Sequence, residues 1–301
     1  MSKNRRNEIK ISDGDRWFYY LVNIFIFIVL VIVAYPLIFV VSSSFSSPHA
    51  VLSGSVLLWP VEFSLDGYTT IFRNKDILIG YYNSFRYMVI GTFFNIAFTM
   101  IAAYPLSRKD TPLRGLWMFL FTFTMYFSGG LIPNYILMMR LHLIDSLWVM
   151  VLPGVISVFN MILARTFMQS SIPNELLEAS QIDGCNDARY FFTRVLPLSK
   201  AVIAVIALYY AVAHWNAYFD AFIYLNTRSL YPLQLFLREI LITNTFDPTL
   251  DVDPELLVKK QGMADLLKYA LIVVASAPMM FIFPMVQRYF GKGVLIGSLK
   301  G

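Results

Sequence analysis

The feature that most constrains this chain is a series of long hydrophobic runs separated by polar connections. The first extends from about Trp17 to Val41 and contains no charged residue after Arg16. A helix needs about 20 mainly apolar residues to cross the hydrocarbon core of a bilayer. The apolar region of a signal peptide is only about 7–15 residues long, and this run is longer and is followed by others. We therefore expect an uncleaved first membrane-spanning helix.

Five further runs predict five more spans, at about Ser84–Leu106, Leu116–Met139, Ser146–Met168, Ala201–Leu225 and Leu266–Phe290. The Gly129-Gly130 pair and Pro133 predict a break in the third span, and lipid tolerates such a break only where protein or a water-filled cavity covers it. Hydrophobic residues make up 57% of the chain and charged residues 14%, against about 45–50% and about 25% in soluble domains. We predict an all-α polytopic membrane protein with six transmembrane helices.

The basic residues indicate how the spans are oriented. With six spans the two tails lie on one side. The tails and the connections 107–115 and 165–200, counted together with Arg288 at the end of the last span, hold 15 of the 24 Lys and Arg residues. Cytoplasmic segments carry an excess of Lys and Arg. We expect the tails 1–16 and 291–301 in the cytoplasm and the domain 17–290 across a bacterial inner membrane.

Several functions are disfavoured by what the sequence lacks. The net charge of +5 comes from dispersed Lys and Arg residues, with no basic stripe that would predict nucleic-acid binding. The single cysteine, Cys185, excludes an intramolecular disulfide and a Cys-based metal cluster. No phosphate-binding G-x-x-x-x-G-K-[ST] motif occurs, and the segment 291–293 is not one. We expect no metal, no cofactor and no ATPase site of the P-loop kind in this chain, and we do not expect an enzyme.

The connection 169–200 is too strongly patterned to be an ordinary loop. Pro173 suits the start of a helix and Gly184 its end. Asn186 or Asp187 can cap a second short helix, and Pro197 ends the segment. A helix–Gly–helix unit joined to spans at both ends is suited to transmitting a push from a soluble partner. The alternative is an amphipathic hairpin that lies on the membrane surface.

The same connection resembles the EAA loop of binding-protein-dependent ABC importers. Glu178-Ala179-Ser180, Gly184 and Leu196-Pro197 match its spacing, whereas Ser180 stands for a second Ala and Arg194 for an apolar residue. In that family the loop forms the coupling helix, which sits in a cleft of the ATP-hydrolysing subunit. We call 169–200 the coupling loop. The resemblance implies ATPase-coupling roles for Glu175, Glu178, Ala179, Ser180, Asp183, Gly184, Leu196, Pro197, Lys300 and Gly301, and places Cys185 near the ATPase surface.

Two more segments resemble the carbohydrate-uptake branch of these importers. They are His214-Trp215-Asn216 with 221–225, and the tail from Gln287 to Gly301, which is similar to the second permease of the maltose importer and to permeases for complex or uronate-containing oligosaccharides. The resemblance implies a type I permease core that translocates oligosaccharides by alternating access. It also implies four partners: a homologous second permease that makes a heterodimer, a dimer of ATP-binding subunits that hold ATP and Mg, an extracytoplasmic sugar-binding protein, and the lipid bilayer.

Polar residues inside the spans are candidates for the substrate path, because a charge at the centre of a span costs about 2.5–3.5 kcal/mol on insertion scales. Asn216 and Asp220 are four positions apart and would share one face of a helix. Aromatic and planar polar groups suit a sugar. The candidates are Tyr126, Asn134, Asn160, Trp215, Asn216, Tyr218 and Asp220. The alternative is that the polar groups tie helices together and that the aromatic residues anchor the helices at the membrane interface.

The outer segment 226–262 has two possible roles. Within the outer segment, the stretch 243–262 carries the acidic residues Asp247, Asp251, Asp253 and Glu255. They fit a solvated face that contacts the binding protein better than a calcium loop, which needs another spacing and a turn glycine.

A self-sufficient secondary transporter or channel for small polar solutes is the main rival class. Such proteins carry several coupling-ion residues and internal repeats. A membrane-embedded enzyme is the third option.

Overall fold

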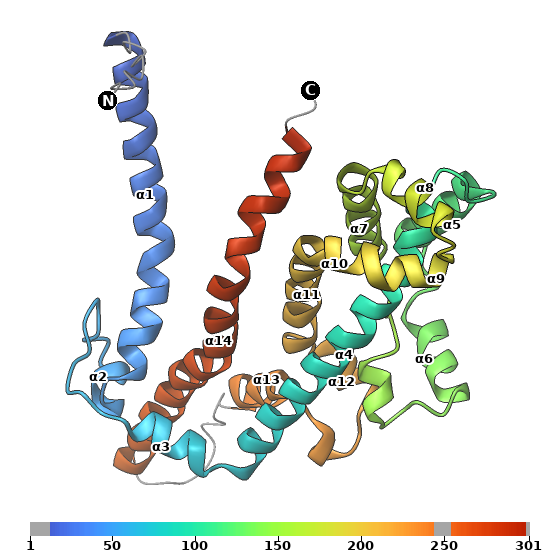
Figure 1. The fold of residues 1–301 in the computed structure, drawn as a ribbon. Helices are drawn as coiled ribbons and strands as arrows, with labels where there is room; N and C mark the ends of the chain where they lie inside the picture. Colours follow the sequence, from blue (N-terminus) through green and yellow to red (C-terminus); the bar gives the residue numbers. More distant parts are fainter. Residues whose placement is uncertain (1–12, 244–253, 299–301) are drawn as a thin grey trace. The chain divides into compact units, whose positions relative to one another are not determined.

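A computed structural model describes residues 13–243 and 254–298. These residues form helices and connections, with no strand among them, which confirms the predicted all-α class (Figure 1). The first helices are α1 (Asp13–Ser44), α2 (Pro48–Leu52), α3 (Asp66–Arg73), α4 (Lys75–Ser107), α5 (Arg114–Tyr126), α6 (Leu131–Arg140), η1 (Leu147–Met150) and α7 (Val158–Ser171). They are followed by α8 (Asn174–Ile182), α9 (Asp187–Tyr190), η2 (Phe191–Val195), α10 (Leu196–Leu198), α11 (Lys200–Trp215), α12 (Phe219–Tyr224), η3 (Arg228–Leu230), α13 (Leu233–Thr243) and α14 (Pro254–Ser298).

Three of the described helices, α1, α4 and α14, are each long and apolar enough to cross a membrane. Two bent pairs pass the same test when each is taken as one span: α5 with α6, and the helical run 187–198 with α11. The described residues therefore supply up to five spans, and the count of six stays a prediction. At the ends, α1 begins at Asp13 and α14 continues to Ser298, so helix extends into both predicted tails.

The predicted break in the third span is confirmed. Helices α5 and α6 are bent by 110° relative to one another. Gly130, between them, has a φ of +88°, which a residue with a Cβ rarely adopts. Pro133 lies in the first turn of α6. Backbone N–H groups there have no intrahelical acceptor, so the N–H that proline lacks is not needed.

The predicted fourth span, 146–168, differs from a single helix. The 3₁₀ helix η1 ends at Met150, and α7 begins only at Val158. Pro153 and Gly154, whose φ is +68°, fall between them and interrupt the helical backbone. Ser157 then caps α7, because its hydroxyl accepts a hydrogen bond from the backbone N–H of Asn160.

The chain divides into two compact units. Unit 1 comprises residues 1–70 and 246–273, and unit 2 comprises 71–245 and 274–301. All described residues with a predicted coupling or substrate-path role belong to unit 2. The sites below are therefore built within unit 2 alone.

The core of unit 2 forms where α4, α7 and α11 pack together. Ala103 of α4 and Ala164 of α7 are fully buried, and such small residues let membrane helices approach closely. Around them lie the larger buried side chains Met100, Leu106, Met161, Met168, Val202 and Ile206. A buried hydrogen bond of 2.7 Å between the hydroxyls of Thr99 and Tyr210 joins α4 to α11. This packing fixes the C-terminal end of α4 beside the start of the coupling loop.

Candidate functional sites

The coupling loop folds as the helix–Gly–helix unit that its sequence predicts. Helix α8 ends at Ile182, and Gly184 follows with a φ of +72°. This left-handed conformation is the usual way to end a helix, and it favours glycine because a Cβ would strain it. Asn186 starts α9, and its side-chain oxygen accepts a hydrogen bond from the backbone N–H of Arg189 at 2.8 Å. Both predicted signals are confirmed, because each acts within a few residues.

The segment ends one residue after Pro197, where its end is predicted, and the proline itself lies inside the helix. The backbone stays helical from Asp187 through Leu198, and the direction changes by 79° only at the junction with α11. The turn before Pro197 is the π-helix η2. In a π-helix the bonds run from residue i to i+5, so the i−4 carbonyl that proline would clash with in an α-helix is displaced. The sequence shows the proline, but it does not show that a π-helical turn precedes it.

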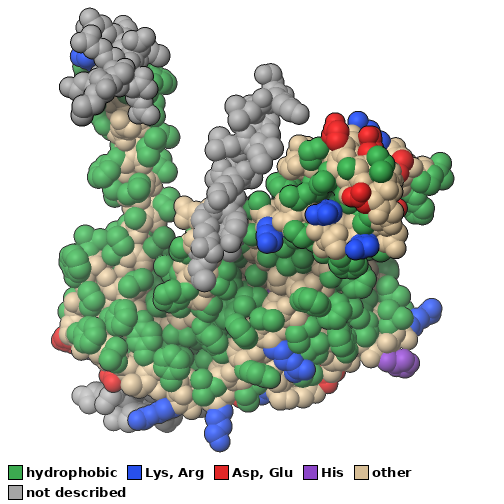
Figure 2. All heavy atoms as spheres, in the orientation of Figure 1, with side chains coloured by type: hydrophobic (Ala, Val, Ile, Leu, Met, Phe, Trp, Pro, Cys, Tyr) green, Lys and Arg blue, Asp and Glu red, His purple; other side chains and the backbone are tan. Residues whose placement is uncertain are grey.

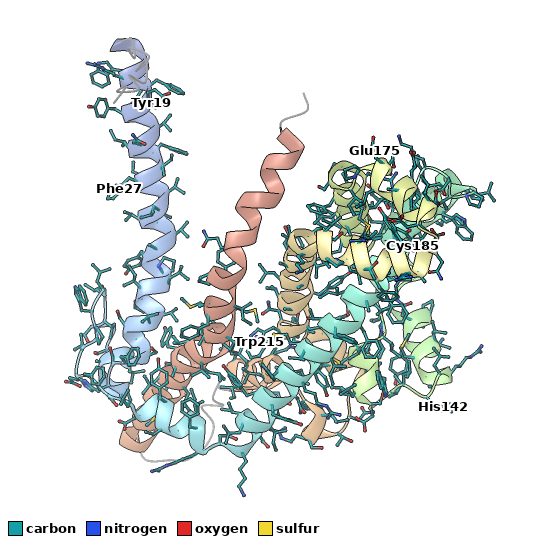
Figure 3. The ribbon with its side chains drawn as sticks, in the orientation of Figure 1. Tyr19, Phe27, His142, Glu175, Cys185 and Trp215 are labelled. Carbon is teal, nitrogen blue, oxygen red and sulfur yellow. The ribbon has the colours of Figure 1, made fainter. Side chains whose placement is uncertain are left out.

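One face of α8 packs against unit 2 and the other is open. Ser180 is buried and donates its hydroxyl hydrogen to the carbonyl oxygen of Leu176 at 2.7 Å, so the serine brings no unsatisfied polar group. Glu175 and Glu178 are exposed, and Ile182 is 87% exposed. Figure 2 shows acidic and basic side chains gathered at this end of unit 2, and Figure 3 shows Glu175 at its tip. This open face of α8 therefore carries two carboxylates and one exposed apolar side chain.

The remaining coupling candidates lie along the same loop. Ala179 and Asp183 are exposed on or directly after α8, and Pro197 is exposed beside half-buried Leu196. Arg194 is also exposed, on η2. Cys185 is half-buried, and its backbone N–H donates to the carbonyl oxygen of Ser180 at 2.9 Å. Lys300 and Gly301 lie outside the described residues.

Arg108, the C-cap of α4, holds the coupling loop in place. Its guanidinium forms ion pairs with Asp110 and with Asp187 of α9, and it donates to the hydroxyl oxygen of Tyr104 at 3.1 Å. The hydrogen bond to Asp110 is the main reason that the pKa of Arg108 is raised above its ordinary value. The same bond lowers the pKa of Asp110. An ion pair between Arg108 and Asp187 thus joins the coupling loop to the end of α4.

The last carbonyl groups of α4 all find side-chain donors. A helix end leaves four such carbonyls without an intrahelical partner. Ser107 donates to Tyr104, and Thr111 to Pro105, each at 2.6 Å. From α7, Arg165 donates to the carbonyl of Leu106 at 2.9 Å and Gln169 donates to the carbonyl of Ser107 at 3.2 Å. The end of α4 is therefore a fixed platform beneath the coupling loop.

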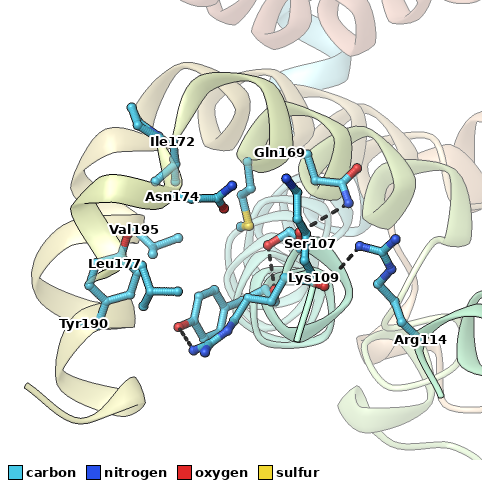
Figure 4. Close-up of a pocket in the computed structure, with 13 residues that line it drawn as sticks. Ser107, Lys109, Arg114, Gln169, Ile172, Asn174, Leu177, Tyr190 and Val195 are labelled. Atoms are coloured by element: carbon cyan, nitrogen blue, oxygen red, sulfur yellow. Dashed lines mark hydrogen bonds between the residues drawn. The ribbon is translucent and has the colours of Figure 1, made fainter. Parts of the chain in front are cut away.

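A cavity of about 430 Å³ lies between this platform and α8 (Figure 4). Its polar lining includes Lys109, Arg114, Gln169 and Asn174. Its apolar lining consists of Met168, Ile172, Pro173, Leu177 and Val195. We call it the basal cavity.

A second cavity, of about 420 Å³, brings two of the predicted substrate-path residues together. Asn160 of α7 and Asp220 of α12 both line it. Exposed Phe159 and Tyr209 line the same space, with ring centroids 6.3 Å apart. Further polar lining comes from Asn95, Ser157, Tyr210 and His214. Aromatic faces beside amide, hydroxyl and carboxylate groups are what a sugar requires, and we call this space the path cavity.

Two residues of the path cavity depend on a glycine. Nε2 of His214 is hydrogen-bonded to Oδ1 of Asn95 at 3.1 Å, and the two residues are 119 positions apart. A Cβ on Gly91 would lie 2.3 Å from that same Nε2. Since Gly91 and Asn95 are one turn apart on α4, the glycine makes the room in which the imidazole reaches the amide.

Trp215 does not contribute to either cavity. Its side chain is 1% exposed, and the indole N–H donates to the carbonyl oxygen of Ala275 at 2.9 Å. Tyr81 packs edge-on against the indole, with centroids 5.4 Å apart. Figure 3 places Trp215 within the body of unit 2. In this structure the indole ties α11 to α14 and has no face free to stack on a sugar.

The expectation that Asn216 and Asp220 share a helical face is wrong. Helix α11 ends at Trp215 and α12 begins at Phe219, because Asn216 is the C-cap of α11. The side chain of Asn216 donates to the carbonyl oxygen of Val212 at 3.0 Å, which satisfies the helix end instead of facing a substrate. A short polar side chain that competes for backbone groups in this way favours helix ends.

The other substrate-path candidates are separate from the path cavity. Tyr126 ends α5 and is 75% exposed, and Asn134 is exposed on α6. Tyr218 is 44% exposed and lies under the guanidinium of Arg238, 5.7 Å from the ring centroid. The acidic residues Asp247, Asp251 and Asp253 lie outside the described residues, and nothing is described of the side chain of Glu255. Among the described residues no group of three or more His, Cys, Asp or Glu could hold a metal ion.

Comparison with known proteins identifies the family. No protein-family model matches the sequence. The polygalacturonan/rhamnogalacturonan transport system permease protein YtcP of Bacillus subtilis (strain 168) is 39% identical over 290 residues, which cover 95% of this chain and 99% of YtcP. The chain belongs to the permease subunits of carbohydrate ABC importers. Protein LplC of the same organism is 38% identical to this permease over 267 residues, covering 88% of the permease and 89% of LplC.

A solved structure agrees with this assignment. It is described as a bacterial ABC transporter involved in the import of the acidic polysaccharide alginate, and one of its chains matches the permease with a TM-score of 0.83 and 31% sequence identity. The match covers 93% of the permease and 98% of that chain. The predicted family, the fold class and the role as an oligosaccharide-importer permease are thereby confirmed. In this family the permeases are integral membrane proteins and ATP is hydrolysed by partner subunits.

Sequence reasoning missed several residues of these sites in the permease. From sequence, Arg108 is only one basic residue of the connection 107–115, and its partner Asp187 is only a possible helix cap. Asn95 carried a usable signal, since an amide inside a predicted span is expensive unless it is paired. Phe159 and Tyr209 carried no such signal in the sequence, because aromatic residues are common throughout these spans.

Proposed function

We propose that this permease translocates acidic, uronate-containing oligosaccharides inward across the bacterial plasma membrane. The observation that carries the substrate class is the pair of similar proteins whose names state a substrate: polygalacturonan/rhamnogalacturonan for YtcP and the acidic polysaccharide alginate for the solved transporter. All three substrates are polymers that bear sugar carboxylates. This permease then works with a second permease, with two ATP-binding subunits that hold ATP and Mg, and with an extracytoplasmic binding protein. It holds no cofactor itself.

The test of substrate class uses the reconstituted importer with its binding protein in liposomes. Oligogalacturonides should stimulate ATP hydrolysis and uptake, whereas neutral arabino- or galactooligosaccharides of the same length should not. Equal or stronger stimulation by the neutral sugars would refute the acidic substrate. Uptake by the purified permease alone, without ATP or partners, would support the rival class of secondary transporters.

We place sugar hydroxyls, not carboxylates, in the path cavity. Asp220 lines it, no Lys or Arg does, and a carboxylate beside a uronate group would repel it. Asn160 and Ser157 supply hydrogen-bonding groups, and Tyr209 and Phe159 supply aromatic surface. The groups that recognise uronate carboxylates then belong to the partner permease or the binding protein. Asp220→Asn should leave the preference for acidic over neutral substrates intact, and loss of that preference would contradict this division.

We also propose that the open face of α8 transmits the conformational change driven by ATP. Its support is the exposure of Glu175, Glu178 and Ile182 on a loop that Arg108 anchors to the platform. Gly184→Pro should uncouple ATP hydrolysis from uptake, because proline fixes φ near −65° whereas this position has +72°. Glu178→Lys should uncouple more strongly than the neutral control Glu178→Gln. Normal substrate-stimulated ATPase activity in Gly184→Pro and Glu178→Lys, with normal membrane insertion, would refute the role.

The orientation, with both tails cytoplasmic, can be tested with the single cysteine of the chain. A membrane-impermeant maleimide should label Cys185 in inside-out vesicles and not in right-side-out vesicles. Short thiol cross-linkers should also join Cys185 to a co-purified ATPase. Labelling from the outside would overturn the orientation, and failure of every cross-linker would favour a hairpin lying on the membrane surface.

A further inference from the structure

The basal cavity has an uneven charge. Two of its lining side chains, Lys109 and Arg114, are cationic besides Arg108, and no Asp or Glu lines it. Arg108 is already neutralised by Asp110 and Asp187. Because Lys109 and Arg114 have no such carboxylate partner among the described residues, the cavity is a candidate site for an anion.

Apart from Arg108, the cations at and beside this cavity are not balanced by carboxylates. Within the described part of the chain, Lys109, Arg114 and Arg165 form no ion pair. Arg114 is instead held by a 3.1 Å hydrogen bond from its guanidinium to the carbonyl oxygen of Arg108. Arg114 and Arg165 also lie close enough for their like charges to interact unfavourably. An anion placed beside them would remove this repulsion.

The neutral lining fits a phosphate group. Gln169 and Asn174 each bring an amide whose N–H groups can bind oxyanion oxygens, and Figure 4 shows both beside Lys109. The wall made by Ile172, Leu177 and Val195 is apolar. A site with cations on one side and an apolar wall on the other matches a phospholipid headgroup with the start of its acyl chains. Basic pockets between membrane helices on the cytoplasmic side bind such headgroups.

We propose that the basal cavity binds a phosphate-bearing anion, either the headgroup of an anionic phospholipid or free phosphate. The occupant contacts the connection after α4 and the start of the coupling loop at once, and so stiffens the attachment of α8 to the platform. Binding depends only on the cavity. Its effect on ATP-driven uptake rests on the coupling role proposed above.

The binding test uses the whole importer complex and native mass spectrometry. Phosphatidylglycerol should remain bound to the permease more than phosphatidylcholine does. Lys109→Gln and Arg114→Gln should each weaken phosphatidylglycerol binding by about fivefold, as expected for one cation near a membrane surface. Lys200→Gln removes an exposed cation from the coupling loop that does not line the cavity, and should leave binding unchanged. Equal binding by all four proteins would overturn the proposal.

The functional test compares nanodiscs that differ in lipid. Substrate-stimulated ATPase activity should be at least threefold higher in phosphatidylglycerol than in phosphatidylcholine. The double variant Lys109→Gln/Arg114→Gln should lose this difference, whereas Lys200→Gln should keep it. If millimolar inorganic phosphate restores wild-type activity in phosphatidylcholine, the natural occupant is free phosphate; if only phosphatidylglycerol does, it is the lipid. A wild-type complex that is active but indifferent to both would overturn the inference. A complex without substrate-stimulated activity in any lipid would instead refute the proposed function.

Discussion

The guanidinium of Arg108, which caps α4, is ion-paired with Asp187, the first residue of α9, 79 positions further along the chain. The arginine side chain is 11% exposed and the aspartate side chain 65% exposed. This pair joins the coupling loop to the helix whose carbonyl end forms the platform. The loop is therefore braced at its middle as well as at the two helices that flank it.

Asp187→Asn should loosen the coupling loop without unfolding the permease. Exposed ion pairs contribute up to about 1 kcal/mol, which corresponds to a loss of roughly two- to fivefold in the fraction of correctly placed loops. Substrate-stimulated ATPase activity should fall by that factor. Asp110→Asn is the matched control, because it removes the other carboxylate from the same guanidinium but leaves the bridge to α9. A larger loss in Asp110→Asn than in Asp187→Asn would contradict the bracing role.

Gly91→Ala should impair transport through a displaced histidine. The new Cβ would lie 2.3 Å from Nε2 of His214, so the imidazole must move away from Asn95. We expect a rise in the KM for uptake of at least threefold, with normal amounts of permease in the membrane. Gly115→Ala on α5 is the control, since no atom lies within 4 Å of the added Cβ there. Unchanged uptake kinetics in Gly91→Ala would show that the His214–Asn95 contact is dispensable.

Substitutions of Trp215 should affect stability more than substrate affinity. Trp215→Phe removes the hydrogen bond to the carbonyl of Ala275, at a cost of about 0.5–1.5 kcal/mol. Trp215→Ala adds a cavity and should cost about 3–5 kcal/mol. Thermal unfolding of the detergent-solubilised complex should follow this order, and the KM of Trp215→Phe should stay within twofold of wild type. A KM that rises sharply at unchanged stability would instead place the indole in the substrate path.

Asp145 supplies a contact whose contribution depends on pH. Its carboxylate accepts from the hydroxyl of Thr227 at 2.5 Å and from the backbone N–H groups of Thr227 and Asn226 at 2.8 and 2.9 Å. The hydroxyl is the main reason that the pKa of Asp145 is lowered. A lowered carboxyl pKa stabilises the folded state above the ordinary value near 4, and this contribution is lost as the pH falls through the folded-state pKa.

Asp145→Ala should therefore lower the unfolding temperature by about 2 °C at pH 7. The difference from wild type should shrink as the pH falls below about 4. Asp145→Asn, which keeps one acceptor oxygen, should lie between the two proteins at pH 7. A difference that stays constant from pH 7 to pH 3 would show that the charge of Asp145 makes no contribution.

Features that act within one or two helical turns were predictable. The apolar runs gave α1, α4 and α14, because crossing a bilayer needs length and hydrophobicity and little else. Gly130 and Gly184 marked the break of the third span and the end of α8, because a positive φ strains any residue with a Cβ. The spacing around Glu178 was specific enough to indicate the family, which the 39% identity to YtcP confirms.

The sequence by itself thus determined the class of the protein, its family, the break at Gly130 and the end of α8 before Gly184. Only the tertiary structure decided that Trp215 is buried, that Asn216 caps a helix, and that His214 lies against Gly91. Those outcomes depend on which helix faces pack together, and a face is set by contacts between residues more than a hundred positions apart, such as Asn95 and His214. Local patterns specify a helix but not its neighbour, because many pairs of apolar faces satisfy the same hydrophobic requirement.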